Sequence, residues 1–292
     1  MKPREILDRA QTPDGSPLEL AREHGHFMIR ISGTPLMSSQ MQGSENAMAH
    51  LAHEALGSLQ SPRILVGGLG MGFTLRSALD VFGKDAHVTV SELLPPVIEY
   101  NRGPLAHLAD QPLDDPRVTI HEGDVGLQLH PERWDVILMD VDNGPDAFTT
   151  RDNARLYSER GVKRLVKSLR PGGVLAVWSA YPSDRFKDRL RRSGLHCRSK
   201  IIRARWPLEK GPKHTIFITD PKGTILETPE DDPVTEPGEM NETRERPKPR
   251  QSKSGQPKSG HFKPRQSKSG QSKSGHSKPR QAKPRRPKPR RS

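Results

Sequence analysis

The sequence predicts an α/β fold in which helices pack on both faces of a doubly wound, Rossmann-like and mostly parallel sheet. Three observations lead to this prediction. Short apolar runs alternate with helical patterns along residues 63–192, which is typical of repeated βα units. A glycine-rich turn joins the first of these runs to its helix. Two consecutive apolar runs then follow with no helix between them, and they predict an antiparallel C-terminal hairpin at the sheet edge.

A small N-terminal β-hairpin and a helix are expected before the sheet. Strands at residues 18–22 and 27–31 flank a turn at His24-Gly25-His26. Apolar residues then recur at helical spacing, namely Ala47, Met48, Leu51, Ala52, Ala55 and Leu56. Ser44 is expected to cap the start of this helix, and Gly57 is expected to end it.

The same patterns place the remaining elements. Buried strands are expected at residues 63–66, 87–90, 118–121, 136–139 and 174–178. Helices are expected at residues 73–82, 96–109, 151–169 and 186–192. Pro171-Gly172-Gly173 predicts a turn before the fifth strand. The closing hairpin is expected at residues 197–204 and 215–219, with a turn that contains Pro207 and Gly211-Pro212.

The strongest functional signal is the glycine-rich turn, which contains Gly68, Gly70 and Gly72. Glycine lets the backbone turn tightly and lets a ligand approach it closely. The dinucleotide fingerprint requires its third glycine where Phe73 stands, so a nicotinamide or flavin cofactor is disfavoured. Glu92 ends the next strand, where a carboxylate can accept hydrogen bonds from both hydroxyls of a ribose. These residues predict a nucleoside site.

The third and fourth strands also end in acids. Asp124 follows Gly123 and could accept a hydrogen bond from an exocyclic amine such as that of adenine. Asp140 and Asp142 lie where the fourth strand leaves the sheet. Paired acids at the mouth of a nucleoside pocket suit a sulfonium, or an amine nucleophile that must be held and deprotonated. The alternative is that these acids only form turns or face solvent.

In this order and spacing, these segments resemble the class I S-adenosylmethionine-dependent methyltransferase fold, and within it the spermidine synthase family. The resemblance covers roughly residues 18–219. It rests on residues 67–72 (GGLGMG), 91–98 (SELLPPVI), 115–118 (DPRV) with Gly123-Asp124, 134–140 (WDVILMD), Tyr157 and 170–175 (RPGGVL).

The resemblance implies a role for each candidate in the nucleoside half of the site. Gly68, Gly70 and Gly72 are implied to line the methionine or aminopropyl end of the cosubstrate. Glu92 is implied to hold the ribose, and Asp124 the adenine. The implied cosubstrate is S-adenosylmethionine or its decarboxylated form, and no metal is expected.

The acceptor half of the site departs from the family. Asp140 is implied to position and deprotonate the attacking amine, but the loop after it, which contains Asp142, is shorter and different. Met48 and Ala49 stand where the family holds its diamine, and apolar side chains cannot bind an ammonium group by hydrogen bonds. Gln40 matches a nucleoside-contacting glutamine only across a one-residue gap. The expected activity is therefore aminopropyl or methyl transfer to a small acceptor, with an amine among the candidates.

Two histidines on the first helix, His50 and His53, lie one turn apart. They could face the pocket, but an exposed polar helix face is the favoured interpretation. Two histidines alone do not make a metal site.

The net charge of +13 comes from 48 Lys and Arg against 35 acids and is unevenly spread. Residues 244–292 carry +17 and contain three 15-residue repeats at 248–292, residues 221–243 carry −6, and residues 1–220 are left with +2. The repeats are expected to be disordered. A second functional hypothesis follows, in which a non-catalytic nucleoside-binding protein is tethered by this tail to RNA or another polyanion. The tail could equally be a solubilising extension.

Four regions are expected: a small N-terminal strand region at 1–43, a nucleoside-binding domain at 44–220, an acidic linker at 221–243 and the basic tail at 244–292. The single cysteine, Cys197, excludes an intrachain disulfide and a cysteine metal cage. No stretch approaches the roughly 20 apolar residues of a membrane span, and the start does not read as a secretory signal. A cytoplasmic protein without membrane contact is expected, and a homodimer is left open.

Overall fold

The computed structural model describes residues 4–141, 144–145, 153–205 and 210–220. Structural statements below concern these residues. The acidic linker and the basic repeats lie outside them, so their expected disorder stays a prediction, as do the expected region boundaries. Within the described ranges, no helix is both long and apolar enough to cross a membrane.

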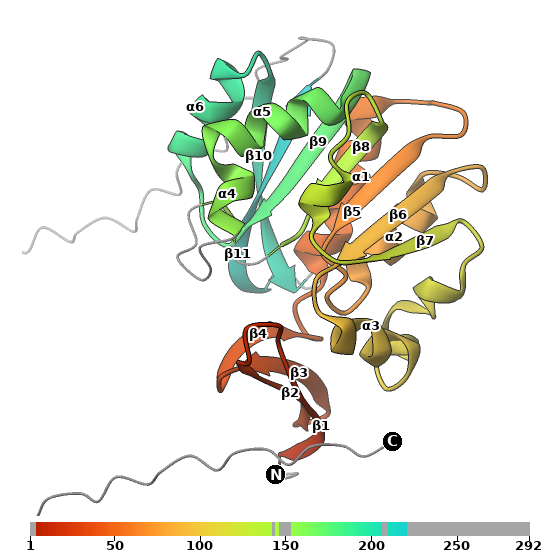
Figure 1. Ribbon diagram of the computed structural model, residues 1–292, viewed down its shortest axis with the longest axis vertical. Coiled ribbons are helices and arrows are strands. Elements are labelled where there is room, and N and C mark those ends of the chain that lie inside the picture. The colour runs from red at the N-terminus through yellow and green to blue at the C-terminus, as the bar shows by residue number, and fades with distance from the viewer. Residues whose placement is uncertain (1–3, 142–143, 146–152, 206–209, 221–292) are drawn as a thin grey trace, which may run out of the picture. The chain divides into compact units, whose positions relative to one another are not determined.

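A four-stranded antiparallel sheet forms the N-terminal part of the described chain (Figure 1). Its strands, paired in sequence order, are β1 (Glu5–Gln11), β2 (Pro17–Glu23), β3 (His26–Ile31) and β4 (Thr34–Ser38). The predicted hairpin corresponds to β2 and β3. The sequence analysis missed β1 and β4. The side chains of β1 are mostly exposed, and β4 has a proline at its second position, so neither strand alternates cleanly between apolar and polar residues.

The second sheet has the order β10-β11-β9-β8-β5-β6-β7 over the described residues. The five strands from β9 to β7 in that order are parallel, whereas β11 runs antiparallel to both β9 and β10. The predicted doubly wound sheet with an antiparallel hairpin edge is therefore confirmed. The strands are β5 (Arg63–Gly67), β6 (His87–Glu92), β7 (Val118–Glu122), β8 (Trp134–Met139), β9 (Leu169–Ser179), β10 (His196–Arg205) and β11 (Lys210–Asp220).

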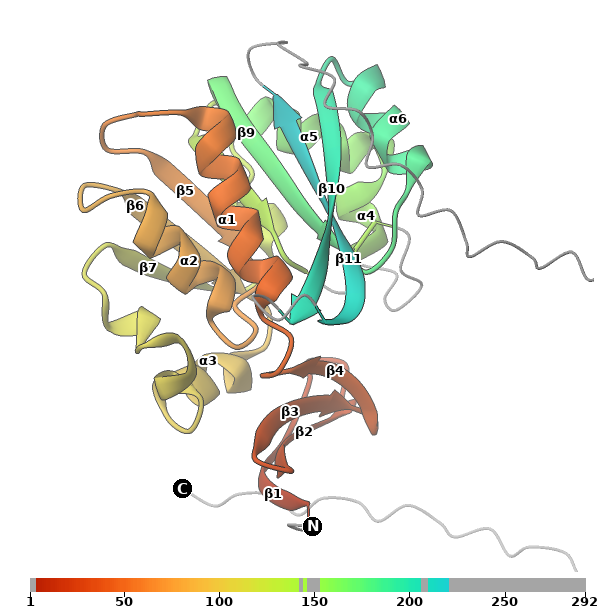
Figure 2. The same cartoon turned by 180° about the vertical axis from the view of Figure 1, so that it is seen from behind.

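Helices cover both faces of this sheet. Figure 1 shows α4 (Asn153–Tyr157), α5 (Glu159–Ser168) and α6 (Asp184–Arg192) in front of it. Figure 2 shows α1 (Gly43–Leu56) and α2 (Phe73–Val81) on the opposite face. The chain between β6 and β8 forms α3 (Pro95–Arg102) and the short 3-10 turns Ala106–Ala109, Pro112–Asp114 and Val125–Gln128.

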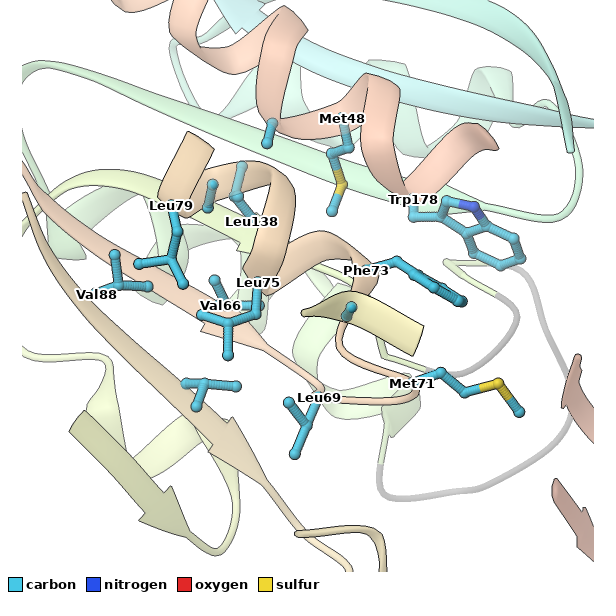
Figure 3. Close-up of a cluster of buried hydrophobic side chains, with 14 of the residues drawn as sticks. Met48, Val66, Leu69, Met71, Phe73, Leu75, Leu79, Val88, Leu138 and Trp178 are labelled. Carbon is cyan, nitrogen blue, oxygen red and sulfur yellow. The ribbon is translucent and has the colours of Figure 1, made fainter. Parts of the chain in front are cut away.

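Alternate residues along each strand build two separate cores. Ile64 and Val66 pack with α1, α2 and α3, whereas Leu65 between them packs with α5 and α6 on the other face. The same alternation divides Val136 and Leu138 from Ile137 and Met139, and repeats in β9 and β11. Because every one of these residues is buried, the strands appear in the sequence as continuous apolar runs. Figure 3 shows part of the first core, where Met48 of α1 lies among Leu75, Leu138 and Phe73.

Two predicted helices are interrupted. The helix expected at residues 96–109 ends at Arg102, because the next two residues are Gly103 and Pro104, and proline cannot continue the hydrogen-bond ladder. The helix expected at 151–169 is divided at Ser158. The Ser158 side chain accepts a hydrogen bond from the Gly161 amide and so caps the start of α5.

Three expectations about termini and turns are wrong. Ser44 does not cap α1, because the cap is Gln42 and the Ser44 hydroxyl bonds other side chains. Pro171-Gly172-Gly173 lies inside β9, where Gly172 takes a positive φ of 80° and the register against β8 shifts. Gly211-Pro212 belongs to β11 rather than to the turn before it.

Gly68→Ala is predicted to destabilise the protein by about 4 kcal/mol or more, which is the range of severe core lesions. Gly68 has a φ of +90°, and a Cβ at that position would lie 2.2 Å from the Asp140 carbonyl oxygen, a backbone atom. Gly172→Ala is the matched control, because its φ is +80° but no atom lies within 4 Å of the added Cβ. The control should lose only about 1–2 kcal/mol. Urea unfolding followed by circular dichroism measures both, and equal losses would contradict the backbone clash.

Candidate active site

A cavity of about 530 Å³ lies at the carboxyl ends of the parallel strands. Its described lining comes from the glycine-rich turn after β5, the ends of β6, β7 and β8, the first turn of α1, and the N-terminal sheet. In doubly wound sheets this edge is the place where ligands bind. The volume suits a ligand of nucleoside size.

The glycine-rich turn forms one wall of the cavity. The Gly68 amide donates to the Ser91 carbonyl at 2.8 Å, and the Asp140 amide donates to the Gly67 carbonyl at 2.8 Å. These bonds fix the turn between the ends of β6 and β8. Gly68 and Gly70 line the cavity, as predicted for backbone that a ligand approaches. Gly72 does not line it. This residue caps α2 with a φ of +84°, and an added Cβ would lie 3.0 Å from Oδ1 of Asn101.

Glu92 is buried at the end of β6, with 7% of its surface exposed. Its Oε2 accepts from the Leu69 amide and its Oε1 from the Leu94 amide, each at 2.9 Å. Burial raises the pKa of Glu92, and the backbone donors oppose that rise. An ionised carboxylate offers about four lone-pair sites. The two oxygens of Glu92 can therefore each accept a further bond from a ligand hydroxyl.

Asp124 lines the cavity and is exposed to solvent. Its Oδ1 accepts from the Gly126 amide at 2.8 Å and caps the 3-10 turn that follows β7. The turn-forming interpretation therefore accounts for one oxygen of Asp124. Asp124 also lies in the cavity lining, so its predicted contact with adenine stays a prediction.

Asp140 and Glu45 form a pair of carboxylates in the same cavity. Oδ2 of Asp140 accepts from the Thr74 hydroxyl at 2.7 Å. Burial raises the pKa of Asp140 to about 6, and the charge of Glu92 adds to the rise. Burial likewise raises the pKa of Glu45 to about 8, with a further contribution from Asp140. Near neutral pH, Asp140 is therefore the acid that ionises first, and Glu45 retains its proton.

A buried network supports Glu45 from behind. Ser44 contacts three groups: its Oγ lies 2.7 Å from Oε2 of Glu45, 2.8 Å from Nδ1 of His214 and 3.0 Å from Nε1 of Trp178. Ser44, His214 and Trp178 are each at most 8% exposed. Burial lowers the pKa of His214, so its ring is neutral.

The Ser44 oxygen joins these three groups. The Trp178 indole can only donate, so it occupies one lone pair of the Ser44 oxygen. The Ser44 hydroxyl bonds Oε2 of Glu45. Nδ1 of His214 makes the third contact, in which the donor is set by the tautomer of the ring.

Five carboxylates line the cavity, and the described lining contains no Lys or Arg. The five acids are Asp14, Glu45, Glu92, Asp124 and Asp140. The only other titratable side chain in that lining is the neutral His214. Such a cavity favours cationic ligands and repels anionic ones. In the described part of the chain, no group of three or more potential ligands is arranged to hold a metal ion.

The structure brings Glu92, Asp124 and Asp140 into one cavity but places other candidates elsewhere. Asp142 lies outside the described residues, and its catalytic role stays a prediction. Gln40 is absent from the described lining, and its Oε1 accepts from Arg205 at 2.7 Å. The predicted nucleoside contact of Gln40 therefore has no geometric support at present.

Four residues of α1 that the sequence analysis discussed, Met48, Ala49, His50 and His53, are also absent from the described lining of the cavity. Met48 and Ala49 are fully buried in the core instead of lining the acceptor half. The His50 side chain is exposed and contacts the Asn46 carbonyl, whereas His53 packs against Phe82. The favoured interpretation of the two histidines as a polar helix face agrees with these positions.

Sequence reasoning missed Glu45, His214 and Trp178 as site residues. Glu45 was detectable as an acid in the first turn of a helix that precedes the glycine-rich turn. His214 and Trp178 gave no signal, because they meet Ser44 across 170 and 134 residues of sequence.

No protein-family model and no curated protein matches the sequence. Solved structures of spermidine synthases do match the fold. One is a spermidine synthase in complex with the transition state analogue AdoDATO, at 17% identity and a TM-score of 0.59 over 74% of this chain and 72% of that chain. Another is spermidine synthase from Thermotoga maritima, at 18% identity and a TM-score of 0.59 over 74% and 73%. At these identities the likeness is one of fold, and it confirms the predicted fold.

Glu45→Gln is predicted to flatten the dependence of stability on pH. Because the folded pKa of Glu45 is raised, its contribution is fully present below the ordinary glutamate pKa and is lost as pH rises towards about 8. One pKa unit corresponds to about 1.4 kcal/mol and the pKa rises from 4.5 to about 8, so a loss on the order of a few kcal/mol between pH 5 and pH 9 should disappear in the variant.

Glu54→Gln is the matched control, because Glu54 is exposed on the same helix. Urea titrations across this pH range measure the free energy of unfolding of each protein. Parallel curves for the wild type and Glu45→Gln would contradict the assignment.

Proposed function

We propose that the protein transfers an aminopropyl group from decarboxylated S-adenosylmethionine to an amine acceptor. The observation that carries this proposal is the acidic cavity, whose described lining has five carboxylates and no Lys or Arg. The decarboxylated cosubstrate carries a sulfonium and an ammonium group but no carboxylate. S-adenosylmethionine would bring its own carboxylate into the same field and be repelled. The acidic lining therefore favours aminopropyl over methyl transfer.

The fold comparisons support the same choice. Both structures named above are spermidine synthases, and one of them binds a transition state analogue. A shared fold alone does not carry an activity, because one fold serves many chemistries. Here the fold and the charge of the cavity point to the same class of substrate.

The nucleoside half of the cavity fits the proposed cosubstrate. Glu92 has both oxygens at the cavity wall with spare lone pairs for the two ribose hydroxyls. Asp124 lines the same cavity, after the neighbouring strand β7, and would accept from the adenine amine. Gly68 and Gly70 would let the sulfonium end pass close to the backbone.

Asp140 would act as the base. The cosubstrate supplies a carbon next to a sulfonium, and its C–S bond breaks with the electron pair moving to sulfur as the acceptor nitrogen bonds to that carbon. Asp140 would take the proton that the nitrogen loses. Its raised pKa makes it a better proton acceptor than an ordinary aspartate, yet leaves it mostly ionised above pH 7. The Thr74 hydroxyl holds Oδ2 and would leave Oδ1 to face the amine.

Glu45 would form the second contact to the acceptor. An ammonium group placed between Glu45 and Asp140 would lower both pKa values and favour the doubly ionised pair. Met48 and Ala49 lie in the core, so binding of the acceptor amine would rest on Glu45 instead. Trp178 lies beside Glu45 in the lining and would offer an indole face to a cation.

The cosubstrate preference is measured by isothermal titration of both nucleosides. Decarboxylated S-adenosylmethionine is expected to bind at least about tenfold more tightly than S-adenosylmethionine, a difference of about 1.4 kcal/mol. Equal affinities, or a preference for S-adenosylmethionine together with methyl transfer, would reject the proposal.

The role of the base is tested with Asp140→Asn. This variant should bind the nucleoside about as tightly as the wild type and turn over roughly 10² to 10⁴ times more slowly, the usual contribution of a positioned base. Asp114→Asn is the control, because Asp114 is exposed and lies outside the cavity lining. Product formation followed by mass spectrometry gives the rates. Retained turnover in Asp140→Asn would show that another group takes the proton.

A further inference from the structure

Residues 1–220 are nearly neutral as a whole but contain one strongly basic segment. Residues 184–213 contain 11 Lys and Arg against three acids, a net charge of +8. Residues 1–220 together carry only +2, so the rest of that region carries −6. The basic segment forms α6 and most of the β10–β11 hairpin.

The basic side chains of the hairpin face solvent. Strand β10 is the edge strand of the seven-stranded sheet, and β11 is its only neighbour within that sheet (Figures 1 and 2). Six exposed cations lie on the two strands, and we call them the hairpin cations: Arg198, Lys200, Arg203, Arg205, Lys210 and Lys213.

The described cations of the hairpin have no ion-pair partner, whereas three cations of the neighbouring helix do. On α6, Lys187, Arg191 and Arg192 each form an ion pair with an acid. Among the described residues, no hairpin cation forms an ion pair. Arg205 donates to the neutral Gln40 amide, and Arg203 donates to a backbone carbonyl.

The strand register places like charges directly opposite one another. Arg203 pairs with Lys213, and Arg205 pairs with Lys210. Like charges in directly opposed positions destabilise a sheet, where opposite charges would contribute roughly 0.2–1 kcal/mol. A few charges are enough to protect an edge strand against aggregation. Opposed pairs of cations exceed that need, and they indicate an anionic ligand that relieves the repulsion when it binds.

The form of the hairpin indicates what kind of anion this is. Arg198 and Lys200 lie roughly 7 Å apart on one face of the edge strand, and Arg203 with Lys213 lies on the opposite face. The cations therefore follow the edge of the sheet, which suits a linear polyanion better than one small anion. Three of the six hairpin cations, Arg198, Arg203 and Arg205, are arginines, and arginine binds phosphate with two parallel hydrogen bonds. Among the described residues of the hairpin, Ile201 is the exposed large apolar side chain, and one such side chain is too little to insert into a lipid surface.

We propose that the β10–β11 hairpin binds the phosphodiester backbone of a nucleic acid. The proposal is independent of the activity suggested for the cavity. It also differs from the tail hypothesis, because it assigns the contact to residues of the folded body.

The test measures binding of the full-length protein to a labelled oligouridine RNA by fluorescence anisotropy over a series of salt concentrations. In the hairpin variant, Arg198, Lys200, Arg203 and Lys213 are each replaced by Gln. Each phosphate contact to a single strand contributes about 0.7 to the slope of log Kobs against log salt, so the slope should fall by roughly 2 to 3. The contribution of the basic tail is present in both proteins and cancels.

The matched control replaces four exposed cations from other elements, Arg9, Arg63, Lys84 and Arg102, by Gln. The control should keep the wild-type slope. Urea unfolding should find the hairpin variant at least as stable as the wild type, because the like-charge pair at Arg203 and Lys213 is removed. A matching oligothymidine distinguishes RNA from DNA, and a lower slope with either one supports the proposal.

Two results would overturn the proposal. One is a slope that stays unchanged in the hairpin variant, or falls equally in the control. The other is weakened binding of the hairpin variant to phosphatidylserine vesicles with no change on either nucleic acid, which would assign the surface to a membrane.

Discussion

The close passage of Gly68 past the carbonyl of Asp140 is the constraint on which the cavity depends. The turn after β5 must cross the end of β8 with no side chain between them, since a Cβ would lie 2.2 Å from that oxygen. Two backbone bonds at 2.8 Å, Gly68 to Ser91 and Asp140 to Gly67, join the ends of three neighbouring strands at this point. The side chains of Glu92 and Asp140 are consequently held at one edge of the sheet by backbone that cannot move independently.

This rigid backbone holds hydrogen-bond donors against several buried acids and so offsets the free-energy cost of burying them. A buried carboxylate is costly unless hydrogen bonds replace its water. The turn supplies the Leu69 amide to Glu92, and α2 supplies the Thr74 hydroxyl to Asp140. Glu45 and Asp140 each receive one hydroxyl, from Ser44 and Thr74 respectively, so the number of donors does not separate them. Burial raises the pKa of both, and the charge of Asp140 raises the pKa of Glu45 further, so Asp140 ionises first.

Sequence patterns predicted the parts of this arrangement that local chemistry determines. Continuous apolar runs located the parallel strands, and the acids at their ends, Glu92 and Asp140, were recognisable because parallel strands present their carboxyl ends at one edge. The interrupted helices depended on single residues, Pro104 and Ser158, inside patterns that otherwise continued. The contacts of Ser44 could not be predicted, because its partners His214 and Trp178 come from strands that meet α1 only in the folded chain.

Charge is separated within the body rather than balanced locally. Five acids line the cavity, and six exposed bases with no ion pair among the described residues lie on the β10–β11 hairpin, so a net charge of +2 over residues 1–220 describes neither surface. Electrostatic fields are screened over about 8 Å in physiological salt, so each surface acts on its own ligand. A cationic amine would be drawn to the cavity and repelled by the hairpin, and a polyanion would experience the reverse. Opposite preferences in one body allow both ligands to bind without competing, which a uniformly basic protein could not achieve.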